Sequence, residues 1–231
     1  METLHKGFTL DTPSGTFPLS TDSMLLADFV RLPRGAHVLD LGSGCGTLGM
    51  LLCAGDVSCR VTGIELDEMA NIAAQENIRR NGLCDRMESI FADLRRLPDT
   101  VKAGSFSCCV SNPPYYSGGA QSRTMPHARH TETCEAEDLF SAAAYALKYG
   151  GDFFLVHKPE MLAQLCAHAV KNGLEPKRLC LVRHSPGKDI STILLQCRKG
   201  GKPGLKPEEC CLFDEHGQPT PAYRRIYHLG D

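Results

Sequence analysis

Short apolar runs and longer amphipathic segments take turns along this chain. The apolar runs contain few polar positions and end at a glycine, an asparagine or an acid, which is typical of strands in a parallel sheet. The segments between them have helical composition. This order predicts an α/β fold with a doubly wound, mostly parallel seven-stranded sheet, helices on both faces and an antiparallel last strand. The strands are expected at 37–41, 60–64, 87–91, 105–110, 152–157, 177–182 and 191–197.

Four helices have recognisable starts or stops. One is expected from about Glu68 to Arg80, where Asn81-Gly82 ends it. Others are expected over 135–149 and from Pro159 to about 171. The run Thr21-Asp22-Ser23 is expected to cap a short helix that carries the next apolar residues.

The two ends of the chain are expected to be appendages of one domain that spans residues 1–231. Residues 1–34 would form an arm and a helix, with a hairpin or extended arm over 7–19. Residues 35–199 would be the cofactor-binding core. Residues 200–231 would be a C-terminal extension with a small hairpin turning at 214–217.

Composition narrows the class of protein. The chain has 231 residues, of which 42% are hydrophobic and 23% charged, as in an ordinary globular protein. A polar N-terminus without a signal peptide, and no apolar run near the roughly 18 residues of a membrane span, predict a cytoplasmic protein without membrane contact. The 12 cysteines include no Cys-x-x-Cys pair, so we expect core thiols in a reducing compartment and no metal site.

A glycine-rich turn follows the first strand. Asp40 and Leu41 lead into Gly42-Ser43-Gly44-Cys45-Gly46, and a helix is expected next. Glycines permit a tight turn from strand to helix and let a ligand approach the backbone. Glu65 ends the second strand 19 residues after Gly46, the spacing of an acid that binds ribose hydroxyls.

The acids near this turn disfavour the obvious alternative, a dinucleotide-binding dehydrogenase. The spacing is Asp-x-Gly-x-Gly-x-Gly, with Asp40 at the strand end, instead of Gly-x-Gly-x-x-Gly. An acid facing the ligand repels a pyrophosphate but suits a cationic sulfonium or an amino group. Asp93 ends the third strand and could accept a hydrogen bond from an adenine amine.

The run Asn112-Pro113-Pro114-Tyr115 follows the fourth strand and carries the most chemical information. Two prolines fix the backbone, so the Asn112 side chain and the Pro113 carbonyl become fixed acceptors beside the Tyr115 ring. Such a group can bind a planar –NH2 and stack the attached ring. With acids at three preceding strand ends, the constellation predicts S-adenosylmethionine beside an amino-group acceptor pocket.

These motifs resemble class I, Rossmann-like methyltransferases that modify exocyclic or amide nitrogens. Further segments are similar to the bacterial tRNA(Val) adenine-N6 methyltransferases, which act on the adenine beside the anticodon. They are Thr21-Asp22 with Leu25-Leu26, the doubled tyrosine with Ser117-Gly118-Gly119, the run 128–131 and the tail 223–227. The resemblance covers nearly the whole chain.

The resemblance implies roles for individual residues. The catalytic residues would be Asn112, Pro113, Pro114 and Tyr115, and tRNA would be the partner. No general base is needed before the methyl group of S-adenosylmethionine is transferred to the adenine amine, because the proton can leave afterward. The cofactor-binding residues would be Thr21, Asp40, Gly42, Ser43, Gly44, Gly46, Glu65, Leu66, Asp93, Leu94 and Asn112.

A net charge of −2 is modest for an RNA-binding protein, so phosphate contacts must come from local basic patches. The long segment 116–133 is the first candidate, with Tyr116, Arg123, Arg129 and His130 as substrate-binding residues. Further basic clusters lie at 183–188 and at Lys199, Lys202 and Lys206. The oligomeric state stays open.

Two other functions fit part of the pattern. A protein glutamine-amide methyltransferase uses the same tetrapeptide, but such enzymes carry a helical domain ahead of the cofactor strand, and only about 35 residues precede it here. A non-catalytic, cofactor-binding RNA chaperone would be expected to lose the tetrapeptide, which is intact. A DNA methyltransferase would need a target-recognition domain for which the chain leaves no length.

Overall fold

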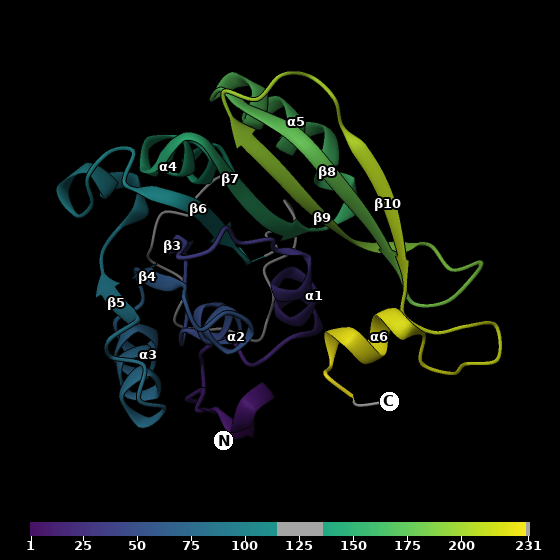
Figure 1. Ribbon diagram of the computed structural model, residues 1–231, viewed down its shortest axis with the longest axis horizontal. Coiled ribbons are helices and arrows are strands. Elements are labelled where there is room, and N and C mark those ends of the chain that lie inside the picture. Colours follow the sequence, from purple (N-terminus) through teal and green to yellow (C-terminus); the bar gives the residue numbers. More distant parts are fainter. Residues whose placement is uncertain (115–135, 230–231) are drawn as a thin grey trace.

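The computed structural model describes residues 1–114 and 136–229, and its centre is one twisted sheet (Figure 1). Within that part of the chain the sheet has eight strands, in the order β10-β8-β9-β7-β6-β3-β4-β5. They are β3 (His37–Leu41), β4 (Arg60–Glu65), β5 (Met87–Phe91), β6 (Phe106–Ser111), β7 (Leu147–His157), β8 (Leu174–Arg183), β9 (Ile190–Lys199) and β10 (Lys206–Cys211).

The seven expected strands are all present, and β9 is the antiparallel one, paired on both sides with β7 and β8. The sheet has one strand more than the seven expected, because β10 was not anticipated. β10 pairs in parallel with β8, from Lys206 opposite Arg178 to Cys211 opposite Arg183, and forms the edge. Its sequence gives little strand signal because its first four residues are exposed and three of them are charged, and Pro207 is tolerated at an edge.

Helices cover both faces of the sheet (Figure 1). The helices α1 (Thr21–Phe29), α2 (Thr47–Gly55) and α3 (Glu68–Arg80) pack on one face. The helices α4 (Ala136–Ala146), α5 (Leu162–Lys171) and the 3-10 helix η2 (Leu94–Asp99) pack on the other. Phe153 and Phe154 of β7 are fully buried in opposite cores, as the alternation of a strand requires.

Several element boundaries differ from the expectation. α3 has the bounds expected from the sequence. α1 begins at Thr21 and its cap is Ser20, whose Oγ accepts a hydrogen bond from the backbone N–H of Ser23 at 3.2 Å. α4 ends at Ala146, and β7 begins at once, five residues earlier than the expected 152. A 3-10 turn, η3 (Pro159–Met161), precedes α5.

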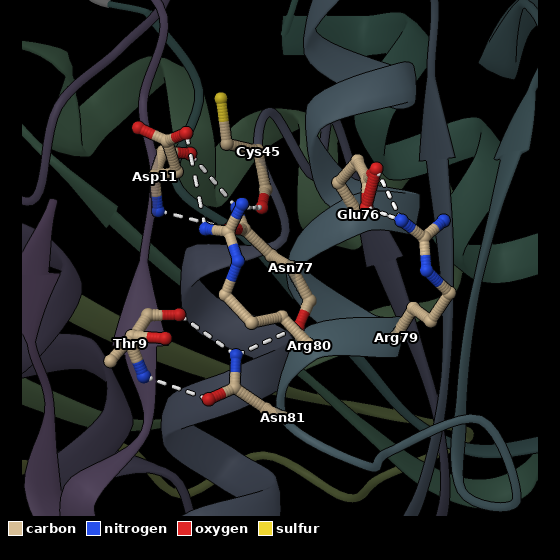
Figure 2. A network of polar contacts seen from close by, with 8 residues as sticks. All are labelled: Thr9, Asp11, Cys45, Glu76, Asn77, Arg79, Arg80 and Asn81. Carbon is tan, nitrogen blue, oxygen red and sulfur yellow. Dashed lines mark hydrogen bonds and ion pairs between the residues drawn. The ribbon is translucent and has the colours of Figure 1, made fainter.

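The N-terminal hairpin lies earlier than the expected 7–19. β1 (Glu2–Thr3) pairs antiparallel with β2 (Thr9–Leu10), and the 3-10 turn η1 (His5–Gly7) reverses the chain. Within 7–19, the segment after β2 runs along α3 toward the glycine turn (Figure 2). Asn81, the C-cap residue of α3, bonds the backbone N–H and C=O of Thr9, at 2.8 Å each.

Asn77 of α3 completes this attachment and is fully buried (Figure 2). Its Oδ1 accepts from the backbone N–H of Asp11 at 2.9 Å. Its Nδ2 donates to the carbonyl of Asp11 at 2.9 Å and to that of Cys45 at 3.0 Å. One side chain therefore joins the arm, the helix and the glycine turn.

The C-terminal extension folds back onto α1. The turn at 214–217 is present as expected, with Gly217 N–H donating to the Asp214 carbonyl at 3.1 Å. The short helix α6 (Pro221–Ile226) then lies beside α1 (Figure 1). Arg225 binds both carboxylate oxygens of Asp28, at 2.8 and 2.9 Å, and the Tyr227 hydroxyl lies 2.9 Å from that of Thr21.

Two negative findings hold for residues 1–114 and 136–229. No helix there combines the length and apolarity that crossing a bilayer requires. No three His, Cys, Asp or Glu side chains in these ranges gather as a metal-binding group.

Candidate active site

Four neighbouring parallel strands carry the predicted site residues to one edge of the sheet. β6, β3, β4 and β5 lie side by side and point the same way, so their carboxyl ends meet. Asp40 of β3 lies opposite Val110 of β6 and Gly63 of β4. Glu65 ends β4, Asp93 follows β5, and Asn112 follows β6. Ligands of doubly wound sheets bind at this edge.

The glycine turn between β3 and α2 needs its glycines. Gly42, Gly44 and Gly46 have φ values of +73°, +55° and +83°, a region that side chains disfavour. The backbone N–H groups of Gly42 and Ser43 both donate to the Ile64 carbonyl, at 2.9 and 3.1 Å, which holds the turn against the end of β4. The turn thus has a fixed shape beside Glu65.

Glu65 is engaged by the turn itself. Its Oε2 accepts from Gly44 N–H at 2.7 Å, and its Oε1 accepts from Asp67 N–H at 2.8 Å. Burial raises the pKa of Glu65, and these N–H groups with that of Leu66 oppose the rise only in part. Because each carboxylate oxygen has a second lone pair, Glu65 can still accept from ribose hydroxyls while it braces the turn.

Asp40 lies beneath the turn and is 1% exposed. A backbone hydrogen bond from Gly49, in the first turn of α2, favours its charged form. Its Oδ2 and the hydroxyl of Ser43 have no hydrogen-bond partner among the described residues. Burial, and then the nearby Glu65 carboxylate, raise the pKa of Asp40 to about 7. Buried acceptors without partners, in a cluster of acids, suit a cationic ligand.

This pKa predicts how cofactor affinity depends on pH. A bound cation favours the charged carboxylate and lowers the pKa of Asp40, so binding releases a proton whenever Asp40 is protonated beforehand. Affinity is therefore expected to be constant above about pH 7 and to fall by up to roughly tenfold per unit below it.

Isothermal titration with S-adenosylmethionine from pH 5.5 to 8.5, in two buffers of different ionisation enthalpy, measures both the affinity and the protons released. The Asp40→Asn variant is the control, because it has no carboxyl to titrate and should lose the dependence near pH 7. If the affinity of the unmodified protein does not change with pH, the assignment of Asp40 to the cofactor site is contradicted.

Asp93 has a strong partner that the sequence analysis did not anticipate. Its Oδ1 accepts from the backbone N–H of Arg95 at 2.9 Å, and the Arg95 guanidinium binds both carboxylate oxygens, with the shortest contact 2.7 Å. The Arg95 side chain is the main cause that lowers the pKa of Asp93, so this acid stays ionised. Leu66 follows Glu65 in the chain, Leu94 follows Asp93, and both leucines are half-buried.

Asn112 is held at the end of β6 by two neighbouring serines. Ser111 is fully buried and its hydroxyl donates to the Leu41 carbonyl at 2.7 Å, which ties this strand end to the start of the glycine turn. The side-chain Nδ2 of Asn112 donates to the Ser23 hydroxyl of α1 at 2.9 Å. No described residue donates to Asn112 Oδ1.

The remaining predicted site residues differ in their location and exposure. Thr21 lies at the start of α1, where its hydroxyl contacts Tyr227. Pro113 is half-buried and Pro114 exposed. Five predicted residues lie outside the described residues, namely Tyr115, Tyr116, Arg123, Arg129 and His130.

Besides Arg95, sequence reasoning missed three residues that shape the site. Ser23 was taken only as a helix cap, Asn77 as an ordinary helix residue, and Gly63 as a strand residue. A Cβ on Gly63 would lie 2.6 Å from the Ser43 hydroxyl, so the turn packs there only against glycine. An asparagine within a helix and a glycine within an apolar strand are both unfavourable locally, and that cost was the available signal.

Comparisons with known proteins identify the family. The family model described as the methyltransferase small domain matches residues 18–172. The chain belongs to this methyltransferase family. The match spans the helix α1, the glycine turn and the Asn-Pro-Pro-Tyr run, so the family resemblance inferred from the sequence is confirmed.

Curated relatives of this methyltransferase are named tRNA1(Val) (adenine(37)-N6)-methyltransferases. The protein of Photobacterium profundum is 27% identical over 93% of each chain, and that of Porphyromonas gingivalis is 30% identical over 84% of this chain and 79% of its own. A crystal structure described as a predicted O-methyltransferase of Agrobacterium tumefaciens superposes with a TM-score of 0.77. It is 22% identical over 90% of this chain and 96% of that one, and this likeness confirms the fold.

Proposed function

We propose that this methyltransferase uses S-adenosylmethionine to methylate the exocyclic N6 amine of an adenine in the anticodon loop of tRNA. One observation carries the proposal. Asn112 follows β6 directly, and its Nδ2 is bonded to Ser23, which leaves Oδ1 as the acceptor for an amine. The names of the curated relatives supply the substrate class and the position, adenine 37 of tRNA(Val).

The residues at the glycine turn fit the cofactor. S-adenosylmethionine supplies a methyl group that its sulfonium already activates. Asp40 and Glu65 place two carboxyl groups at the turn, which favour the positive charge of this cofactor and oppose the pyrophosphate of a dinucleotide. Glu65 would bind the ribose hydroxyls, Asp93 with Leu94 the adenine, and Gly42 to Gly46 would line the methionine part.

The acceptor residues perform positioning. Asn112 Oδ1 and the Pro113 carbonyl would accept the two hydrogens of the adenine amine and so keep its lone pair directed toward the cofactor. Positioning of two reactants can supply most of the acceleration when one is already activated. The amine needs no base before it reacts, because its proton can leave to water after the bond forms. The adenine must be unstacked to reach Asn112.

Two of the candidate phosphate-binding cations already have partners within the protein. Arg183 pairs with Glu209 at 3.3 Å. The ammonium group of Lys199 donates to the carbonyls of Ala144 and Leu147 at 2.6 and 2.7 Å. We therefore keep the segment 116–133 as the first candidate for RNA contact, ahead of the clusters at 183–188 and 199–206.

An anticodon stem-loop oligonucleotide tests the proposal. We expect methyl transfer to the loop with adenine at position 37 and none to the same loop with guanine there, because the guanine 6-oxo group cannot donate to Asn112 Oδ1. The rate at sub-saturating RNA should fall as salt rises, since phosphate contacts release counterions.

A glutamine-containing peptide serves as the competing acceptor in the same assay. Transfer to the peptide and not to the RNA would contradict the proposal and favour the glutamine-amide function. Cofactor binding without transfer to either acceptor would favour the non-catalytic RNA chaperone.

A further inference from the structure

Ser23 and Asn112 lie 89 residues apart in the chain and meet at the acceptor end of the sheet. Ser23 is 5% exposed, and its hydroxyl accepts a hydrogen bond from Asn112 Nδ2 at 2.9 Å. A serine buried on the first turn of α1 thus contacts the side chain that the proposed function assigns to the amine.

The cap of α1 offers the Ser23 hydroxyl an acceptor for its own hydrogen. Ser20 Oγ accepts from the backbone N–H of Ser23 at 3.2 Å, and the two serine hydroxyls also lie 3.2 Å apart. When the Ser23 hydroxyl donates its one hydrogen to Ser20 Oγ, it keeps only lone pairs for Asn112. Those lone pairs require the NH2 end of the Asn112 amide, and the oxygen end is left for the substrate.

The orientation of that amide decides whether the site can bind an amine. The two ends of an asparagine amide have nearly the same size and opposite hydrogen-bonding character. With Oδ1 toward the substrate, Asn112 accepts from the –NH2 of the base. In the reversed orientation, the NH2 group of Asn112 would face that amine, donor against donor. The lone pair of the amine would then no longer be directed toward the cofactor.

Neighbouring elements hold the first turn of α1 in place. The Thr192 hydroxyl of β9 donates to Asp22 Oδ1 at 3.2 Å. The Tyr227 hydroxyl, after α6, lies 2.9 Å from that of Thr21. Contacts on both residues before Ser23 therefore restrict movement of this turn relative to the sheet.

We propose that Ser23 is a positioning residue for methyl transfer, which fixes the Asn112 amide with its oxygen toward the acceptor amine. This inference rests on the proposed function for the identity of the amine. Ser23 thus orients the Asn112 amide in addition to lying in the capped first turn of α1.

Steady-state kinetics on the anticodon stem-loop test the role. Ser23→Ala is expected to lower kcat roughly tenfold, the effect of one lost hydrogen bond that orients a reacting group. The KM for RNA and the dissociation constant of S-adenosylmethionine should stay within about twofold. Ser23→Thr keeps the hydroxyl and should recover most of the kcat.

The matched control is Ser107→Ala. Ser107 is also buried, and its hydroxyl donates to the His37 carbonyl at 3.1 Å, but it is near the amino end of β6, away from the acceptor. It should lose stability without the selective loss in kcat. Equal kcat values for Ser23→Ala and the parent would overturn the proposal.

The side-chain amide signal of Asn112 gives a readout that needs no activity. It is assigned in a ¹⁵N–¹H spectrum as the pair that vanishes in Asn112→Ala. We expect Ser23→Ala to shift this pair and speed its exchange with water, and Ser107→Ala to leave it in place. An unmoved pair in Ser23→Ala refutes the contact. A parent that methylates no RNA contradicts the proposed function alone, and the amide signal still decides the pairing.

Discussion

Replacing Asn112 with alanine is expected to lower kcat for methyl transfer by roughly a hundred- to a thousandfold, the scale of removing a group that binds the reacting centre. The dissociation constant of S-adenosylmethionine should change little, because the carboxyl groups of Asp40 and Glu65 belong to other strand ends. Pre-steady-state transfer to the anticodon stem-loop measures the rate, and titration measures the cofactor.

Asn112→Asp separates the acceptor role from packing. A carboxylate keeps two acceptor oxygens and the same shape, so this variant should retain more activity than Asn112→Ala. To keep this contact, the Ser23 hydroxyl must turn from Ser20 and donate its hydrogen to the new carboxylate. If Asn112→Ala turns over at the parental rate, the amine pocket has been placed on the wrong residue.

Asn77→Ala is expected to lower the free energy of unfolding by about 3 kcal/mol, because it leaves three backbone groups of Asp11 and Cys45 without their partner. For a chain of this length that corresponds to a fall in Tm of roughly 6–12 °C. The loss combines the attachment of the arm with that of the glycine turn (Figure 2). Urea or thermal unfolding of the purified variants gives the number.

Asn81→Ala is the matched comparison for Asn77→Ala. Asn81, the C-cap residue of α3, makes the same pair of contacts with Thr9 and a third with the Asn77 carbonyl at 2.7 Å, but it is only half-buried and does not reach the glycine turn. Its loss should cost less, because water can reach the backbone groups that it leaves, and the cofactor affinity should be normal. Equal losses for the two variants would mean that the deeper burial of Asn77 and its contact with Cys45 add nothing.

The sequence predicted most of the sheet because the strands near its centre are buried on both faces. Runs such as Val38-Leu39 and Phe153-Phe154-Leu155 are apolar throughout, and no surface helix has that pattern. β10 was missed because its position is set by tertiary pairing with β8. Its first four side chains are exposed, so this strand lacks the apolar pattern of the central ones.

The site was predictable to the extent that a local motif fixes it. The glycines of the turn and Pro113 determine the local backbone geometry, so the sequence motif alone indicates the turn and the position of Asn112. Ser23, Asn77 and Arg95 act by contact, and the first two do so with residues more than 30 positions away. No spacing rule links a serine in a helix cap to an asparagine four strands later, so only the fold could bring them together.

Transfer of a labelled methyl group to cellular tRNA tests the proposed methylation of adenine N6 most directly. Total tRNA from a strain that lacks the protein is incubated with purified enzyme and trideuteromethyl S-adenosylmethionine, then digested and analysed by nucleoside mass spectrometry. We predict a heavy N6-methyladenosine signal that maps to one anticodon-loop adenine and is lost with Asn112→Ala. A heavy methyl on any other nucleoside, or label found only in protein, would contradict the account.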